Sequence, residues 1–191
     1  MTRAGVILAG GRSRRMGTSK ALVPLQGIAL LDRVVARVAP QVEDLAISTN
    51  VALPTPFPQL ADPIGEFQGP LAGILAALEW ATRLGHVTVA TFPCDTPFLP
   101  LDVVSRLADA CADVAVARTN DRVHPVCAIW STRVATALRA TLEDPTGERS
   151  VMRFLGRCEM AVVDFSTRNG DPFLNMNCRA DLEGAERVLA A

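Results

Sequence analysis

Residues 8–20 read LAGGRSRRMGTSK, and they begin within the last two residues of an uncharged run, 4–9, of small and β-branched residues. Such a run predicts a buried strand, which the adjacent glycines Gly10 and Gly11 bring to an end. Glycines let backbone N–H groups turn toward a ligand without a Cβ in the way, and the arginines and lysine that follow add positive charge. The stretch therefore predicts a strand and then a loop that cradles a polyphosphate.

This loop matches neither of two familiar phosphate-binding patterns. It lacks the Gly-Lys-Ser/Thr ending of a Walker A loop, and it lacks the G-x-G-x-x-G spacing of dinucleotide-binding proteins. On the residues alone, a structural turn remains the alternative to a phosphate site.

Strand and helix patterns alternate along the rest of the chain. Five prolines between residues 51 and 70 exclude regular structure over most of that stretch. The alternation predicts an α/β fold of three layers, with a mainly parallel central sheet and helices on both faces. Ligands of such sheets bind beyond the carboxyl ends of the strands. We expect strands at 4–9, 45–48, 86–92, 113–117, 126–130 and 161–165, and helices at 30–38, 71–84, after Pro100, at 132–142 and at 181–189.

Composition narrows the class of protein. The chain has 191 residues, 49% hydrophobic and 20% charged, with a net charge of -1, which is typical of one compact domain over residues 1–191. A near-neutral chain is a poor candidate for nucleic-acid binding, and no apolar run reaches the roughly 20 residues of a membrane span. Five cysteines without a C-x-x-C pair favour free thiols in a reducing compartment. We therefore expect a cytoplasmic protein with neither nucleic acid nor membrane as a partner.

A carboxylate follows another predicted strand. Asp95 lies in FPCDTPF, residues 92–98, directly after the strand at 86–92, so it should reach the same edge of the sheet as Gly10. Because Mg²⁺ takes oxygen ligands, often one or two carboxylates plus substrate phosphates, Asp95 suits a magnesium anchor. The alternative role is a helix N-cap ahead of Pro97 and Pro100.

The loop at 8–20, together with PCDTPF and with GPLAG at 69–73, resembles the signature of MobA-like nucleotidyltransferases that act on the molybdenum cofactor and related phosphates. The resemblance runs from Gly5 to about Leu182, and it implies a Rossmann-like nucleotidyltransferase fold. One position departs from the pattern, because many members have Asp immediately before the lysine where this chain has Ser19.

The resemblance also assigns site residues. It implies catalytic roles for Arg15 and Lys20 at the phosphates and for Asp95, which is also the Mg²⁺ ligand. Solvated or capping roles are the alternatives for Arg149 and Asn177. The implied nucleotide-binding residues are Leu8, Ala9, Gly10, Gly11, Lys20, Asn50, Asp62, Gly69 and Asp95, and the implied acceptor-binding residues are His124, Arg149, Asn175 and Asn177.

The implied reaction joins GMP from GTP to molybdenum-bound molybdopterin and releases pyrophosphate. GTP and Mg²⁺ would occupy the N-terminal half of the domain and molybdopterin the C-terminal half. The candidate protein partners are a molybdenum-insertion protein and the molybdoenzymes or their chaperones. The nucleophile would be an ionised phosphate oxygen, so no general base is needed, in agreement with a chain that has two histidines.

Three other functions remain as alternatives. A cytidylyltransferase for the same cofactor usually has LAAG in the loop and lacks GPLAG. Sugar-phosphate or phospholactate nucleotidyltransferases should lack the Arg149 and Asn175-x-Asn177 pattern. A non-catalytic relative should have lost Lys20 or Asp95, and both are present.

Overall fold

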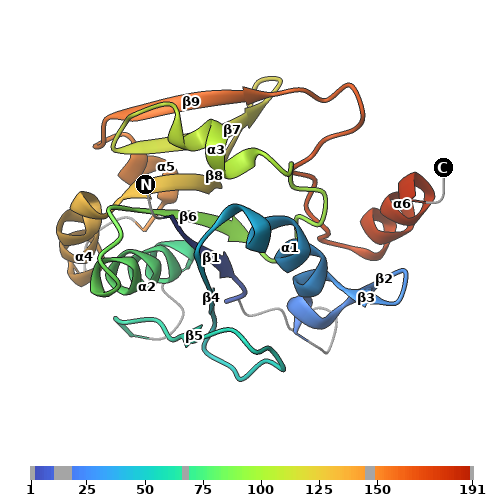
Figure 1. Cartoon of the computed structure of the whole chain (residues 1–191), viewed down its shortest axis with the longest axis horizontal. Coiled ribbons are helices and arrows are strands. Elements are labelled where there is room, and N and C mark those ends of the chain that lie inside the picture. Colours follow the sequence, from blue (N-terminus) through green and yellow to red (C-terminus); the bar gives the residue numbers. More distant parts are fainter. Residues whose placement is uncertain (1–2, 11–18, 66–68, 145–148, 190–191) are drawn as a thin grey trace.

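The computed structural model describes residues 3–10, 19–65, 69–144 and 149–189. Within these ranges, seven strands form one twisted sheet that crosses the molecule (Figure 1). Its members are β1 (Ala4–Leu8), β4 (Asp44–Ser48), β5 (Gln59–Leu60), β6 (Thr88–Pro93), β7 (Val114–Thr119), β8 (Arg122–Ser131) and β9 (Met160–Phe165). Their spatial order is β5-β4-β1-β6-β8-β7-β9.

The sheet is mainly parallel, as predicted. β1 pairs in parallel with β4 and β6, β4 with β5, and β7 with β9. β8 runs antiparallel to both of its neighbours, a direction that the residue pattern does not indicate. Its direction follows from the short connection Asn120-Asp121 between β7 and β8, because so few residues can only return the chain antiparallel. Asn120 takes a positive φ of 50° in that turn.

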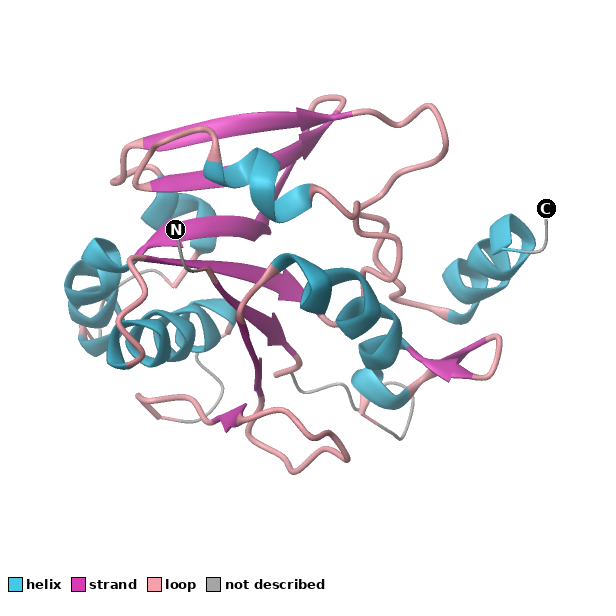
Figure 2. Cartoon of the chain, in the orientation of Figure 1, coloured by secondary structure: helices cyan, strands magenta, loops and turns pink. Residues whose placement is uncertain are grey.

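Helices cover both faces of the sheet, which confirms the predicted three layers (Figure 2). α1 (Leu30–Val38) and α3 (Val103–Ala108) pack on one face, where their apolar side chains join one core cluster. α2 (Pro70–Arg83), α4 (Ala135–Glu143) and α5 (Val151–Leu155) pack on the other face and join a second cluster. The five-residue helix α5 is an addition to the predicted elements.

A third, smaller core lies beyond the edge of the sheet. The hairpin of β2 (Pro24–Leu25) and β3 (Ile28–Ala29) packs there against α6 (Arg179–Leu189), as Figure 1 shows beside the C-terminus. Leu25, Met176 and Ala185 are buried in this core. Met176 lies just before α6, so the packing holds the segment that leads into α6 against the main domain.

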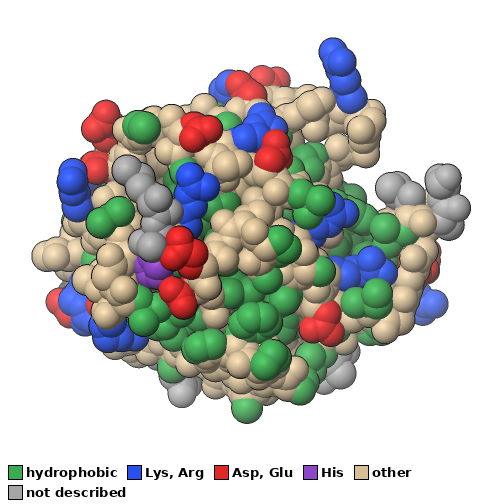
Figure 3. All heavy atoms as spheres, in the orientation of Figure 1, with side chains coloured by type: hydrophobic (Ala, Val, Ile, Leu, Met, Phe, Trp, Pro, Cys, Tyr) green, Lys and Arg blue, Asp and Glu red, His purple; other side chains and the backbone are tan. Residues whose placement is uncertain are grey.

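The surface seen in Figure 3 intersperses basic, acidic and apolar side chains. No helix in the described ranges is both long enough and apolar enough to cross a bilayer. Between residues 51 and 65 the chain forms regular structure only in the two-residue strand β5, in agreement with the expected effect of the prolines.

Candidate functional site

Four polar side chains meet beyond the carboxyl end of β6. The ammonium of Lys20 donates to Oδ2 of Asp95 and, at 2.7 Å, to Oδ1 of Asn177. The amide Nδ2 of Asn175 donates to Oδ1 of Asp95 at 3.1 Å. The side chains of Lys20 and Asp95 are 22% and 10% exposed. We call Lys20, Asp95, Asn175 and Asn177 the polar cluster; it joins segments as far as 157 positions apart in the sequence.

Backbone hydrogen bonds fix the turn after β6, which carries Asp95. The Cys94 N–H donates to the Leu8 carbonyl at 3.1 Å, and the Asp95 carbonyl accepts from the Met176 N–H at 2.9 Å. The buried Thr96 hydroxyl donates to the Pro93 carbonyl at 2.9 Å. The Asp95 carboxylate is therefore set in place by β1 on one side and by the segment before α6 on the other.

The start of α6 holds the backbone at Asn177. The carboxylate Oδ2 of Asp181 accepts the backbone N–H groups of Asn177 and Cys178 at 2.7 and 2.8 Å. These hydrogen bonds lower the pKa of Asp181. Sequence reasoning missed Asp181, although an acidic residue in the first turn of a helix is a recognised capping signal.

A second polar pair lies at the carboxyl ends of β4 and β5. Nδ2 of Asn50 donates to Oδ2 of Asp62 at 2.7 Å, and the Asp62 N–H donates to Oδ1 of Asn50 at 2.9 Å. Asn50 is exposed and Asp62 is partly buried, and each lies just beyond the end of its strand. The structure thus brings together the two polar residues that were predicted for the nucleotide pocket.

The end of β1 lies between these two groups. The Ala9 N–H donates to the Ser48 carbonyl at 2.8 Å, and Leu8 is buried. Gly10 is exposed, and a Cβ added there would meet no atom within 4 Å. Gly11 and Arg15 lie outside the described residues.

The two glycines of GPLAG are required for different structural reasons. Gly69 precedes α2 with φ 73° and ψ -167°, a conformation that is essentially restricted to glycine. Gly73 faces the sheet, where an added Cβ would come within 2.8 Å of the Ser48 hydroxyl and 3.2 Å of Leu8 Cδ2. The motif therefore lets α2 begin and pack close to the ends of β1 and β4.

The remaining predicted acceptor residues differ in their surroundings. His124 is 6% exposed, and its Nε2 lies 2.7 Å from the Thr119 hydroxyl. Its ring lies 4.8 Å from that of Phe173, and burial lowers its pKa. It lies near the start of β8, at the edge of the sheet where β6 ends, because the two strands are antiparallel. Arg149 is exposed just before α5 and takes no part in the polar cluster.

Two buried cysteines near the site are poor candidates for a nucleophile. Burial and the neighbouring Asp95 raise the pKa of Cys94 to about 12 and raise that of Cys127 further. No group of three or more His, Cys, Asp or Glu side chains able to hold a metal occurs among the described residues. A metal at Asp95 would thus take most of its ligands from elsewhere, such as a substrate phosphate.

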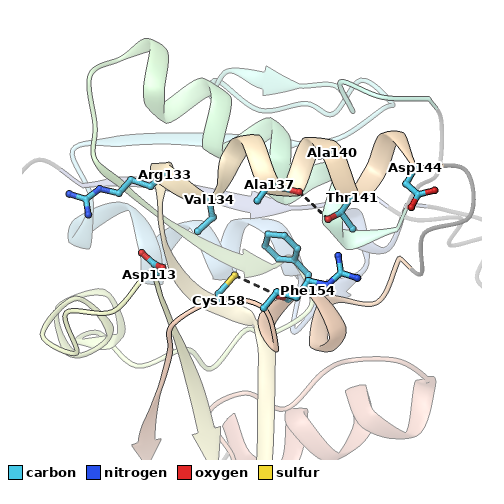
Figure 4. A pocket seen from close by; sticks show the side chains of 10 residues that line it. Asp113, Arg133, Val134, Ala137, Ala140, Thr141, Asp144, Phe154 and Cys158 are labelled. Atoms are coloured by element: carbon cyan, nitrogen blue, oxygen red, sulfur yellow. Dashed lines mark hydrogen bonds between the residues drawn. The ribbon is translucent and has the colours of Figure 1, made fainter.

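A cavity of about 560 Å³ lies on the other side of the domain, between α4 and α5 (Figure 4). Thr141 donates to the Ala137 carbonyl at 2.9 Å, and Cys158 contacts the Phe154 carbonyl at 3.6 Å. None of the predicted site residues lines this cavity. The chemistry-bearing residues instead gather at the carboxyl edge of the sheet.

The chain is similar to known proteins in sequence and in fold. The family model of the MobA-like NTP transferase domain matches residues 5–161. Two similar curated relatives are named molybdenum cofactor guanylyltransferase. That of Mesorhizobium japonicum is 44% identical over 97% of this chain and 95% of its own, and that of Rhodobacter capsulatus is 46% identical over 97% and 96%.

A solved structure extends the likeness to the fold. The molybdopterin-guanine dinucleotide biosynthesis protein A of Archaeoglobus fulgidus superimposes with a TM-score of 0.75 at 23% identity and covers 99% of both chains.

Proposed function

The chain belongs to the MobA-like NTP transferase family, and within it we infer the activity of a molybdenum cofactor guanylyltransferase, which transfers GMP from GTP to molybdenum-bound molybdopterin. The observation that carries this inference is the polar cluster at the carboxyl edge of the sheet, whose Lys20 follows the arginine-rich stretch 12–15 in the sequence. The cluster combines a cation for phosphates with a carboxylate for a metal, which is what nucleotidyl transfer requires.

The reaction forms one bond and breaks one. An oxygen of the molybdopterin phosphate attacks the α-phosphorus of GTP, and the bond from that phosphorus to the bridging oxygen of the β-phosphate breaks. Pyrophosphate leaves with the bonding electrons, and the new diphosphate joins GMP to the pterin. Lys20 is proposed to neutralise the charge that develops on the pyrophosphate, together with Arg15 of the loop.

Asp95 fits the role of a Mg²⁺ ligand. It offers a hard carboxylate with 10% exposure, and the side-chain oxygen of Asn177 lies beside Lys20 in the same cluster. Oxygen donors of this kind, completed by phosphates, form the usual ligand set for Mg²⁺. When bound, Mg²⁺ would stabilise the charge on the transferred and leaving phosphates.

The nucleotide is proposed to lie over the ends of β1, β4 and β5. Asn50 and Asp62 form a polar pair there, and Gly69 and Gly73 allow the start of α2 to come close. The exposed Gly10 leaves room for the base and ribose beside Leu8 and Ala9. GPLAG supports guanine over cytosine, so a cytidylyltransferase is the less favoured alternative.

The acceptor is proposed to bind on the C-terminal side of the polar cluster. His124 lies at that edge, and Arg149 can offer a bidentate donor to an anionic phosphate. Asn175 and Asn177 would have two roles, since their amides also contact Asp95 and Lys20. Under this proposal GTP and Mg²⁺ bind to the N-terminal half of one domain and molybdopterin binds to the C-terminal half.

The test is a transfer assay with molybdenum-bound molybdopterin, Mg²⁺ and GTP labelled at the α- or γ-phosphate. The α-label should appear in a pterin dinucleotide and the γ-label in pyrophosphate, and neither should move without the pterin. Release of γ-label as inorganic phosphate, with no labelled dinucleotide, would contradict the proposal.

A further inference from the structure

Lys20 is the one lysine of the 191-residue sequence; the other 18 basic residues among the 19 Lys and Arg are arginines. Lysine differs from arginine in carrying a compact charge on a flexible stem, with three donors that rotate freely. A chain that uses arginine everywhere else thus has a lysine at the centre of its polar cluster. The side chain that can most easily change partners lies where phosphates and a metal are proposed to bind.

The ammonium of Lys20 has two partners in the structure. It donates to Oδ2 of Asp95 and to Oδ1 of Asn177, while Asn175 donates to Oδ1 of Asp95. Both carboxylate oxygens of Asp95 are therefore engaged, and the ammonium sits where a cation ligated by Asp95 would be placed. A largely buried carboxylate requires such a counter-charge, because an unpaired buried charge is costly.

We propose that Lys20 is an exchangeable counter-ion: it pairs with Asp95 and keeps a divalent cation off that carboxylate until the phosphates of the nucleotide draw the ammonium away. A divalent cation on Asp95 would be repelled by the ammonium at the same oxygen. Polyphosphate carries several negative charges, so it competes with a single carboxylate for Lys20. The side chain is 22% exposed, so the ammonium can turn toward a ligand without unfolding.

The consequence is that polyphosphate and metal bind cooperatively. Each should raise the affinity for the other by the same factor, since coupling between two binding events is reciprocal. The side-chain oxygen of Asn177 accepts a second hydrogen bond from the ammonium, so Asn177 helps to keep Lys20 beside Asp95. This inference rests on the proposed function for the identity of the ligands, but not on the choice of base.

The first experiment measures Mn²⁺ binding by the loss of the free-ion electron paramagnetic resonance signal, with and without pyrophosphate. For the wild type, pyrophosphate should tighten Mn²⁺ binding by about tenfold or more, after correction for the Mn²⁺–pyrophosphate complex in solution. Lys20→Met should bind Mn²⁺ alone about tenfold more tightly than the wild type does. The matched control Lys20→Arg keeps the charge and should stay within about threefold of the wild type.

Equal Mn²⁺ affinity of the wild type and a folded Lys20→Met variant would overturn the proposal. Failure of Asp95→Ala to reduce Mn²⁺ binding in the Lys20→Met background would also overturn it, because the metal would then not be on Asp95.

A second experiment needs no variant, because lysine-selective ¹⁵N or ¹³C labelling gives one side-chain signal in this chain. Pyrophosphate should shift the Lys20 signal, and subsequent Mg²⁺ should shift the carboxylate of Asp95 in aspartate-labelled protein. A Lys20 signal that does not respond to saturating pyrophosphate would contradict the exchange. Because pyrophosphate has no base, a failure of GTP selectivity would overturn the proposed function and leave this result intact.

Discussion

Two contacts between a basic side chain and a carboxylate lie at opposite ends of the same sheet. Lys20 and Asp95 meet where β6 ends, with side chains 22% and 10% exposed. His86 and Asp44 meet where β6 and β4 begin, 2.7 Å apart and 4% and 49% exposed. At the amino end the buried partner is the base, and its Nδ1 has no hydrogen-bond partner among the described residues.

Both contacts join a basic side chain to a carboxylate. Only their position in the fold indicates which one belongs to a ligand-binding site. His86 and Asp44 join the starts of two strands, so their contact stays within the scaffold. Lys20 and Asp95 come from loops beyond the strand ends, where two asparagines from a distant segment join them. Ligands of parallel sheets bind at that end, and the N-terminal part of this sheet is parallel.

The largest effect is expected from breaking the contact at the carboxyl end. Asp95→Ala or Lys20→Ala should lower the rate of guanylyl transfer by roughly 10²-fold or more, because Lys20→Ala removes a positive charge beside the leaving pyrophosphate and Asp95→Ala removes the carboxylate proposed to hold Mg²⁺. The rate is measured with saturating GTP and pterin, and circular dichroism checks the fold. Near-wild-type turnover in either variant would remove that residue from the mechanism.

The two ends of α2 offer a matched pair of glycines. Gly69 at its start and Gly85 after its end have φ of 73° and 81°, and an added Cβ would meet nothing within 4 Å at either position. Alanine at each should therefore destabilise the protein through backbone strain alone, by about 1–3 kcal/mol. Thermal or urea unfolding measures this loss.

The pair separates structure from function because only Gly69 lies at the carboxyl end. Gly69→Ala should also weaken GTP binding in calorimetry, whereas Gly85→Ala should leave GTP binding unchanged. Equal loss of GTP affinity in both variants would mean that Gly69 has no special place beside the nucleotide.

Breaking the contact at the amino end should affect stability only. His86→Ala removes the hydrogen bond to Asp44 and should cost about 1 kcal/mol, a small value because Asp44 is half exposed. Urea unfolding measures the cost, and turnover under saturating substrate should match the wild type. A loss of turnover like that of Asp95→Ala would contradict the division between the two ends.

The smallest effect concerns pH. Burial lowers the pKa of His124, so on acidification the unfolded chain binds a proton before the folded protein does. Stability should therefore be complete above the ordinary histidine pKa of about 6.5 and should fall as the pH drops below it. His124→Gln should flatten the dependence of the unfolding free energy on pH in that range. An unchanged slope in the variant would show that another group titrates there.

Much of the fold could be predicted because regular patterns are long enough to read. An uncharged run of small and β-branched residues predicts the strand at 4–9, and helical spacing of apolar residues predicts the helix at 30–38. Both occur within a residue of the predicted bounds. The strands β2 and β3 have two residues each, too few for any period to be visible. The direction of β8 depended on the turn Asn120-Asp121, whose backbone geometry a residue pattern does not report.

The candidate site also has a part that the sequence predicts and a part that it does not. Motifs next to strand ends pointed to Lys20 and Asp95, and these do contact each other. That Asn175 and Asn177 would reach them across 80 and 157 positions could not be inferred, because tertiary packing of Met176 and α6 sets that approach. Their expected contacts with the acceptor stay a prediction.

The most direct test of guanylyl transfer is a competition in one reaction, with equal GTP and CTP, Mg²⁺ and limiting molybdenum-bound molybdopterin, in which both dinucleotide products are measured. The guanine dinucleotide should predominate by at least about tenfold. An equal mixture, or a predominance of the cytosine product, would contradict the assignment of guanine to the site beside Gly69 and Gly73.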